Sequence, residues 1–141
     1  LKSVLSCLSQ TGLNFVFPVH PRTQKNIQRF GIDIPANIEM IEPQGYLSML
    51  GLIQKAQYVF TDSGGLQKEA FFLQKKCVTL RDSTEWVETI DLGMNILALD
   101  KNAEIDHQRI MSYLEKPVLM DQLGFPYGNG AAADEIVKII N

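Results

Sequence analysis

The residues with the clearest chemical potential lie in the run Val59–Ala70, which reads VFTDSGGLQKEA. A hydrophobic strand leads into Ser63-Gly64-Gly65, and a helix is expected to begin there. The paired glycines carry no Cβ, so a ligand can come close to the backbone. The first amides of a helix lack partners within it and lie at the positive end of its dipole, which suits a phosphate. Ser63 adds a hydroxyl donor, and Glu69, about one turn into the helix, can accept hydrogen bonds from ribose hydroxyls.

The same residues also have a purely structural interpretation. Serine is a favoured residue just before a helix, and two glycines make a tight turn. The Ser-Gly-Gly run alone therefore leaves two possibilities open, a phosphate site and a capped strand–helix junction. The run is neither a Walker loop nor a dinucleotide fingerprint, because the required glycine spacing and the Lys-Ser/Thr pair are missing.

A phosphate site of this kind needs strands and helices that alternate, and the sequence predicts that alternation. The expected strands are 14–19, 38–41, 58–60, 76–80 and 95–99. The expected helices are one at the amino terminus, then 21–30, 45–56, 66–73 and 84–90, with further helices around Pro117 and the 126–130 loop. The strands are almost continuously apolar, which indicates a sheet covered on both faces. The prediction is one Rossmann-like α/β domain over residues 1–141, with a parallel sheet and a ligand beyond the strands' carboxyl ends.

Composition narrows the class of protein. The chain has 141 residues, 45% hydrophobic and 21% charged, which is typical of one globular domain with its own core. Its net charge of −3 and the lack of a Lys/Arg cluster argue against nucleic-acid binding. No apolar run approaches the roughly 20 residues that span a bilayer, so no membrane association is expected. Cys7 and Cys77 lie far apart and outside any metal or redox motif, which predicts buried thiols in a reducing cytosol.

The amino terminus has apolar residues at helical spacing (Leu1, Val4, Leu5 and Leu8), but no capping residue and no initiator methionine. We therefore expect the chain to begin inside a helix and to be part of a longer protein.

The run Thr61–Glu69 closely resembles the signature of the non-hydrolysing UDP-N-acetylglucosamine 2-epimerase family, which reads Thr-Asp-Ser-Gly-Gly and, a few residues later, Glu. Segments 19–22, 41–46, 80–85 and 126–130 resemble, in the same order, the family's Val-His-Pro turn, Pro-Gln-x-Tyr element, Arg-Asp-x-Thr-Glu loop and Asn-Pro-Tyr-Gly-Asp-Gly loop. These five collinear matches cover essentially the whole chain, but only about the second half of a family member.

The resemblance implies the second half of a GT-B architecture, in which two Rossmann-like domains hold a UDP-sugar between them. It implies that Ser63, Gly64 and Gly65 hold the diphosphate, Glu69 the ribose, and that Gln44 lies beside the uracil. Met49 falls where some relatives have an aromatic residue against the base, and a core role is its alternative. His20 and Arg22 would face the cleft, or else simply form a turn and a helix start.

The loop after strand 76–80 should line the same edge, which makes Arg81 and Trp86 candidate substrate contacts. Many relatives read Glu-Arg-Pro-Glu where this chain reads Glu85-Trp86-Val87-Glu88, and the resemblance assigns that arginine to the nucleotide sugar. Trp86 cannot supply the charge. It either stacks on a ligand or marks a subgroup that uses a modified sugar, such as a diacetamido uronic acid.

The family reaction inverts C2 of the sugar by eliminating UDP and adding it back. The resemblance places the catalytic carboxylates and a His-Arg-x-Glu loop in the amino-terminal half, so no catalytic residue is assigned here, and this chain alone is expected to bind UDP weakly without turnover. The implied partners are UDP, a UDP-sugar, the amino-terminal domain and a second subunit of a cytoplasmic homodimer, with no cofactor and no metal. The alternatives are the nucleotide-diphosphate-binding domain of a GT-B glycosyltransferase and a non-enzymatic interaction domain.

Overall fold

The computed structural model describes residues 1–100, 102–118, 124 and 126–140, and strands alternate with helices through most of them. The strands are β1 (Phe15–Pro18), β2 (Ile38–Ile41), β3 (Tyr58–Thr61), β4 (Lys76–Thr79) and β5 (Asn95–Leu97). The helices are α1 (Lys2–Ser9), α2 (Pro21–Arg29), α3 (Tyr46–Lys55), α4 (Gly64–Phe72), α5 (Val87–Asp91), α6 (His107–Glu115) and α7 (Ala132–Ile140). The predicted order of elements is confirmed, including the helix at the amino terminus.

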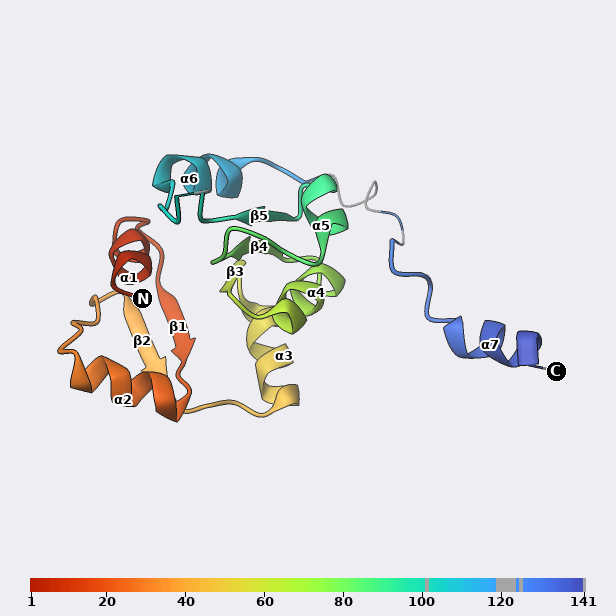
Figure 1. Ribbon diagram of the computed structural model, residues 1–141, viewed down its shortest axis with the longest axis horizontal. Helices are drawn as coiled ribbons and strands as arrows, with labels where there is room; N and C mark the ends of the chain where they lie inside the picture. Colours follow the sequence, from red (N-terminus) through yellow and green to blue (C-terminus); the bar gives the residue numbers. More distant parts are fainter. Residues whose placement is uncertain (101, 119–123, 125, 141) are drawn as a thin grey trace.

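All strand pairs are parallel, which confirms the α/β class, but the strands form two sheets rather than one continuous sheet. β1 pairs with β2, and a separate sheet has the order β3-β4-β5 (Figure 1). Side chains rather than a backbone ladder connect β1 with β3: the rings of Phe15 and Phe60 meet edge to face, with centroids 5.2 Å apart. An aromatic pair of this kind favours the contact without fixing a backbone register.

Helix α1 connects the two sheets through its buried side chains. Leu5 and Leu8 pack with Ile38 of β2, whereas Cys7 packs with Val78 of β4 and with the buried face of α6. All four residues of β4 are buried, so this strand lies at the centre of its sheet and is covered on both faces. Both cysteines are buried, and burial raises the pKa of Cys77 to about 12.

Helix α4 begins earlier than its apolar pattern predicts. Ser63 is the residue before the helix, with extended backbone angles, and its Oγ accepts the Leu66 amide at 3.4 Å. This cap satisfies the Leu66 amide and favours a helix start at Gly64, although glycine itself disfavours a helix. The helix ends at Phe72. Gln74, two residues beyond, turns the chain with a φ of 55°, and the Lys75 amide donates back to the Ala70 carbonyl.

The carboxyl-terminal helix differs from the others in burying none of its side chains. Ile136, Val137, Ile139 and Ile140 are all more than half exposed, and α7 lies apart from the rest of the molecule (Figure 1). None of the helices in the described ranges is long and apolar enough to cross a membrane.

Candidate functional site

The turn between β3 and α4 presents two open amides. The Ser63 amide donates to Thr61 Oγ1 at 3.0 Å, and the Leu66 and Gln67 amides donate to Ser63. Within the described part of the chain, these bonds leave the Gly64 and Gly65 amides of the first turn without an intramolecular acceptor. A Cβ built on Gly65 meets only Ser63 Oγ, at 3.7 Å. Ser63 and Gly65 are exposed, and Gly64 is half-buried. The turn is therefore accessible, and its free donors come from the two glycines.

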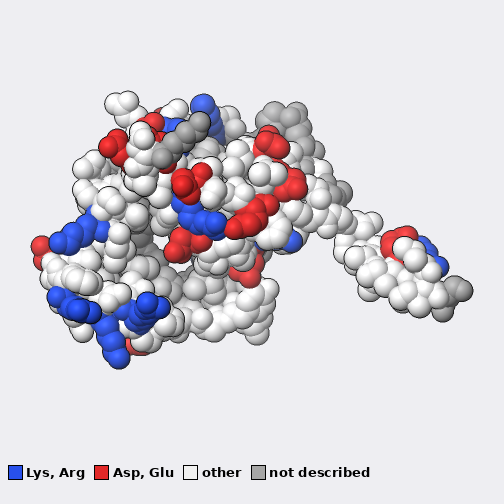
Figure 2. Space-filling model, viewed as in Figure 1, with Lys and Arg blue, Asp and Glu red and all other residues white. Residues whose placement is uncertain are grey.

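The loop between β4 and α5 brings a charged cluster to the same place. Arg81 holds Glu85 through two hydrogen bonds, of 2.9 and 3.3 Å, and the Asp62 and Asp82 carboxylates are close enough to act on it. The hydrogen bonding that Arg81 donates to Glu85 is the main reason that the pKa of Arg81 is raised, and it also lowers the pKa of Glu85. Figure 2 shows basic and acidic side chains gathered beside a hollow in this face of the molecule.

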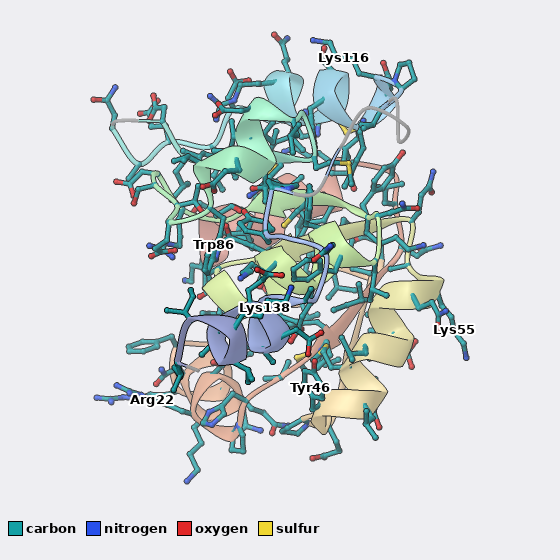
Figure 3. All side chains as sticks on the ribbon, turned by 90° about the vertical axis from the view of Figure 1, so that its right-hand side faces the viewer. Arg22, Tyr46, Lys55, Trp86, Lys116 and Lys138 are labelled. Carbon is teal, nitrogen blue, oxygen red and sulfur yellow. The ribbon has the colours of Figure 1, made fainter. Side chains whose placement is uncertain are left out.

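Trp86 reaches the turn directly. Its indole Nε1–H donates to the Gly64 carbonyl at 2.8 Å. Its main chain is also fixed, because its amide donates to Thr84 Oγ1 at 3.1 Å and its carbonyl accepts the Thr89 hydroxyl at 2.6 Å. Figure 3 shows Trp86 beside α4.

A buried polar network holds this loop against α4 and β5. Thr84 donates to Gln67 Oε1, and Asn95 donates to Gln67 at 3.3 Å and to Thr89 at 3.2 Å. Thr79 donates to Asn95 Oδ1 at 2.9 Å. Sequence reasoning missed this network, since its five members lie on five separate segments and each reads alone as an ordinary polar residue.

An aromatic cluster surrounds Lys68 on the adjoining face of α4. Its Nζ lies 4.4 Å from the ring centroid of Trp86, 4.7 Å from that of Tyr127 and 5.8 Å from that of Phe72. Tyr127 in turn donates to Glu88 Oε2 at 3.2 Å, and burial together with this carboxylate raises the pKa of Tyr127 to about 12. Tyr127 lies in the 126–130 loop that resembles the family, but no role for Tyr127 or for Lys68 was predicted from the sequence.

Two predicted contacts, His20 and Gln44, lie at the carboxyl ends of the other sheet. His20 is the residue before α2, and its Nδ1 accepts the Arg22 amide at 3.2 Å. Gln44 follows β2 and donates to the Glu42 carbonyl at 2.7 Å. Arg22 is exposed and points outward from α2 (Figure 3).

The remaining two candidates lie on helices. Met49, on α3, packs against the core cluster of Ile53 and Val59. Glu69 lies half-buried on α4, one turn beyond the glycines.

The arrangement brings Ser63, Gly64, Gly65, Arg81 and Trp86 together at the end of β3 and β4. Open amides at a helix start bind anions, and an arginine nearby adds a positive charge. No group of three metal-binding side chains occurs among the residues that the structure describes. In open α/β domains the ligand site lies beyond the carboxyl ends of the parallel strands, and this turn occupies that position.

Comparison with known proteins gives the family. Residues 1–141 match the family described as UDP-N-acetylglucosamine 2-epimerase, and the chain belongs to that family. It is 39% identical to UDP-2,3-diacetamido-2,3-dideoxy-D-glucuronate 2-epimerase of Pseudomonas aeruginosa, covering 99% of this chain and 39% of that protein. It is 42% identical to a UDP-N-acetylglucosamine 2-epimerase of Methanococcus maripaludis, covering 90% of this chain and 35% of that protein.

Solved structures of UDP-GlcNAc 2-epimerases also match this chain. The Methanocaldococcus jannaschii UDP-GlcNAc 2-epimerase, crystallised with UDP-GlcNAc and UDP, matches 99% of this chain with a TM-score of 0.76 and 33% identity, and 38% of that chain is covered. The Neisseria meningitidis enzyme bound to UDP-GlcNAc gives a TM-score of 0.69 and 30% identity, with 99% of this chain and 40% of that chain covered. The chain thus spans about two fifths of the length of these relatives.

Proposed function

We propose that this chain is the carboxyl-terminal, UDP-binding domain of an epimerase that inverts C2 of UDP-N-acetylglucosamine or a related UDP-acetamido sugar. The observation that carries the proposal is the pair of open amides at Gly64 and Gly65, at the start of a helix that follows a parallel strand. In this proposal those amides and the Ser63 hydroxyl hold the diphosphate, and Glu69 holds the ribose. Arg81 offsets part of the charge, and Trp86 completes the loop side of the site.

The other sheet supplies the rest of the nucleotide site. Gln44 lies beside the uracil. Its amide nitrogen donates to the Glu42 carbonyl, so its amide oxygen is available to the base, and Met49 supports the base from α3. His20 faces the sugar side. Because Nδ1 of His20 accepts the Arg22 amide, the neutral ring carries its proton on Nε2 and presents a donor.

The domain's chemical contribution is to stabilise the leaving group. Loss of the C2 proton and cleavage of the C1–O bond release UDP, and the electron pair of the C2–H bond becomes the double bond of a glycal. The bridging oxygen leaves with the C1–O pair, so two oriented amides at the diphosphate stabilise the charge that develops there. UDP then adds back to C1, and a proton returns to the opposite face of C2. The acids and bases belong to an amino-terminal domain, which we propose as this chain's partner.

A second substrate is favoured by one specific observation. The Pseudomonas aeruginosa relative is named for a diacetamido glucuronate, and Trp86 stands here where the family resemblance implies an arginine. We therefore keep a UDP-diacetamido uronic acid as the alternative sugar. The proposal also includes a homodimer, a cytoplasmic location and a role in supplying sugars for cell-surface polysaccharides, all of which follow from the family alone.

Calorimetric titration of the chain with UDP tests the proposal. The Ser63→Asp variant keeps a good helix cap while placing a carboxylate against the diphosphate, so it should fold normally and lose UDP binding. The matched control is Asp106→Ser, the reverse exchange at the residue before α6, where Asp106 caps the Arg109 amide at 2.9 Å. The control should bind UDP like the unmodified chain. Absence of heat with UDP for the unmodified chain, or equal binding by Ser63→Asp, would overturn the proposal.

A further inference from the structure

We propose that Trp86 is the positioning residue of the diphosphate site: its indole N–H fixes the Gly64–Gly65 peptide, and the Lys68 ammonium holds the ring in place. This inference rests on the proposed function, because it concerns the same diphosphate. It assigns Trp86 a role through the protein backbone rather than a stacking contact with the ligand.

The first step is the geometry of one peptide group. The Gly64 carbonyl and the Gly65 amide belong to the same planar trans peptide, so they point in opposite directions. A hydrogen bond that fixes the Gly64 carbonyl therefore also fixes where the Gly65 N–H points. This peptide lies between two glycines, whose torsion angles are the least restricted of any residue. The hydrogen bond from Trp86 therefore restrains a peptide whose flanking residues have little side-chain restriction of their own.

The second step is that the donor is itself immobile. The Trp86 amide and carbonyl are both bonded, to Thr84 and Thr89, and Thr84 is tied to Gln67 of α4. A Cβ built on Gly64 would lie 3.4 Å from Trp86 Nε1 and 3.4 Å from Glu85 Oε2, so the indole is packed against this residue. The indole N–H is therefore directed at the Gly64 carbonyl by a loop whose main chain is held by hydrogen bonds.

The third step is the cation over the ring. Lys68 is four residues after Gly64, on the same face of α4, and its Nζ lies 4.4 Å from the Trp86 centroid. The rings of Trp86 and Tyr127 meet edge to face at 5.9 Å, and they enclose the ammonium from two sides. A cation attracted to the ring face draws electron density from the indole, which strengthens its N–H as a donor. Lys68 and Trp86 therefore act as one unit.

The experiment compares the affinity for UDP with that for uridine, which lacks the diphosphate. Trp86→Phe keeps an aromatic ring but loses the N–H, so it should raise the Kd for UDP about five- to tenfold and leave the Kd for uridine unchanged. Lys68→Met, which keeps the side-chain length, should raise the Kd for UDP by a smaller factor. If Trp86→Phe fails to fold, this variant still tests whether Lys68 and Trp86 act together on UDP binding. Val87→Ala, at an exposed residue next to Trp86 that begins α5, is the control and should bind both ligands normally.

The emission of Trp86 gives a second readout, because it is the only tryptophan in the chain. UDP should change this emission until the site is saturated, and the UDP concentration at half of the change should equal the Kd measured by calorimetry. Uridine should leave the emission unchanged. UDP binding with no emission change and with an unaltered Kd in Trp86→Phe would overturn the inference while leaving the proposed function standing. An equal rise in Kd for UDP and uridine would also overturn it, since that result indicates a general effect on the fold. Absence of UDP binding in the unmodified chain would instead refute the proposed function.

Discussion

Replacing Gly65 by alanine should make the fold more stable and UDP binding weaker. The Cβ has room, since its nearest contact is Ser63 Oγ at 3.7 Å, and the residue is helical with no positive φ. Alanine restricts the unfolded chain more than glycine, so the substitution should stabilise the fold by roughly 0.5–1 kcal/mol. For a domain of this size that corresponds to an increase in Tm of about 1–4 °C.

The same methyl group would stand between the Gly65 amide and a phosphate. Loss of one hydrogen bond to a charged group costs about 1.5–3 kcal/mol, so the Kd for UDP should rise roughly 10- to 100-fold. Thermal denaturation followed by circular dichroism gives the first quantity, and calorimetry with UDP gives the second. The two effects have opposite signs, which excludes general damage to the fold as their common cause.

Gly51→Ala is the matched control. Gly51 lies inside α3, and a Cβ built there meets nothing within 4 Å. This variant should gain stability by a similar amount and keep the unmodified affinity for UDP. If Gly65→Ala is stabilised as expected but binds UDP with an unchanged Kd, then the glycine is not a point of close approach, and the argument from the open amide is wrong.

Three other predictions concern the surroundings of the turn. Asn95→Ala removes a buried side chain that bonds three partners, and it should destabilise the fold by about 3 kcal/mol in urea denaturation; a loss near zero would show that the network is dispensable. Arg81→Met leaves the negative charges of Glu85 and its neighbouring carboxylates uncompensated, so the Kd for UDP should rise about tenfold in low salt and less in high salt. A change in Kd that calorimetry finds to be independent of salt would contradict this. Burial, and then the neighbouring Glu88 carboxylate, raise the pKa of Tyr127 from 10.0 to about 12. The stability that the neutral phenol contributes is therefore fully present below pH 10 and is lost as the pH rises through about 12. The tyrosinate absorbance of the unmodified chain minus that of Tyr127→Phe should show one phenol ionising near pH 12, and ionisation near pH 10 would refute the burial argument.

Much of the fold was predictable because it depends on local patterns. The apolar runs of the strands and the helical spacing between them predict the order of elements. The residue type of Ser63 makes a helix cap one of its two possible roles, and the structure shows that cap. The chemistry of the turn was equally local, since the glycines and the serine are consecutive in the chain. The start of α4 was placed two residues late, because the glycines masked the helical signal.

The parts that could not be predicted depend on tertiary contacts. The separation of β1 from β3 rests on how Phe15 meets Phe60, and one sequence gives no register for that contact. The position of Lys68 over Trp86 joins segments 18 residues apart, and Tyr127 comes from still further along the chain. The departure from the family at Trp86 was visible as a missing charge, but its bond to Gly64 could only be seen once the loop had been folded onto α4.

The junction between the two sheets determines where the molecule can move at low cost. Within each sheet, separating strands breaks backbone hydrogen bonds, whereas between β1 and β3 the described residues offer aromatic rings and the side chains of α1. Such contacts can slide by small amounts without losing a directional bond. A nucleotide whose phosphates lie against one sheet and whose base lies against the other would set the angle between them, and α1 would be the pivot.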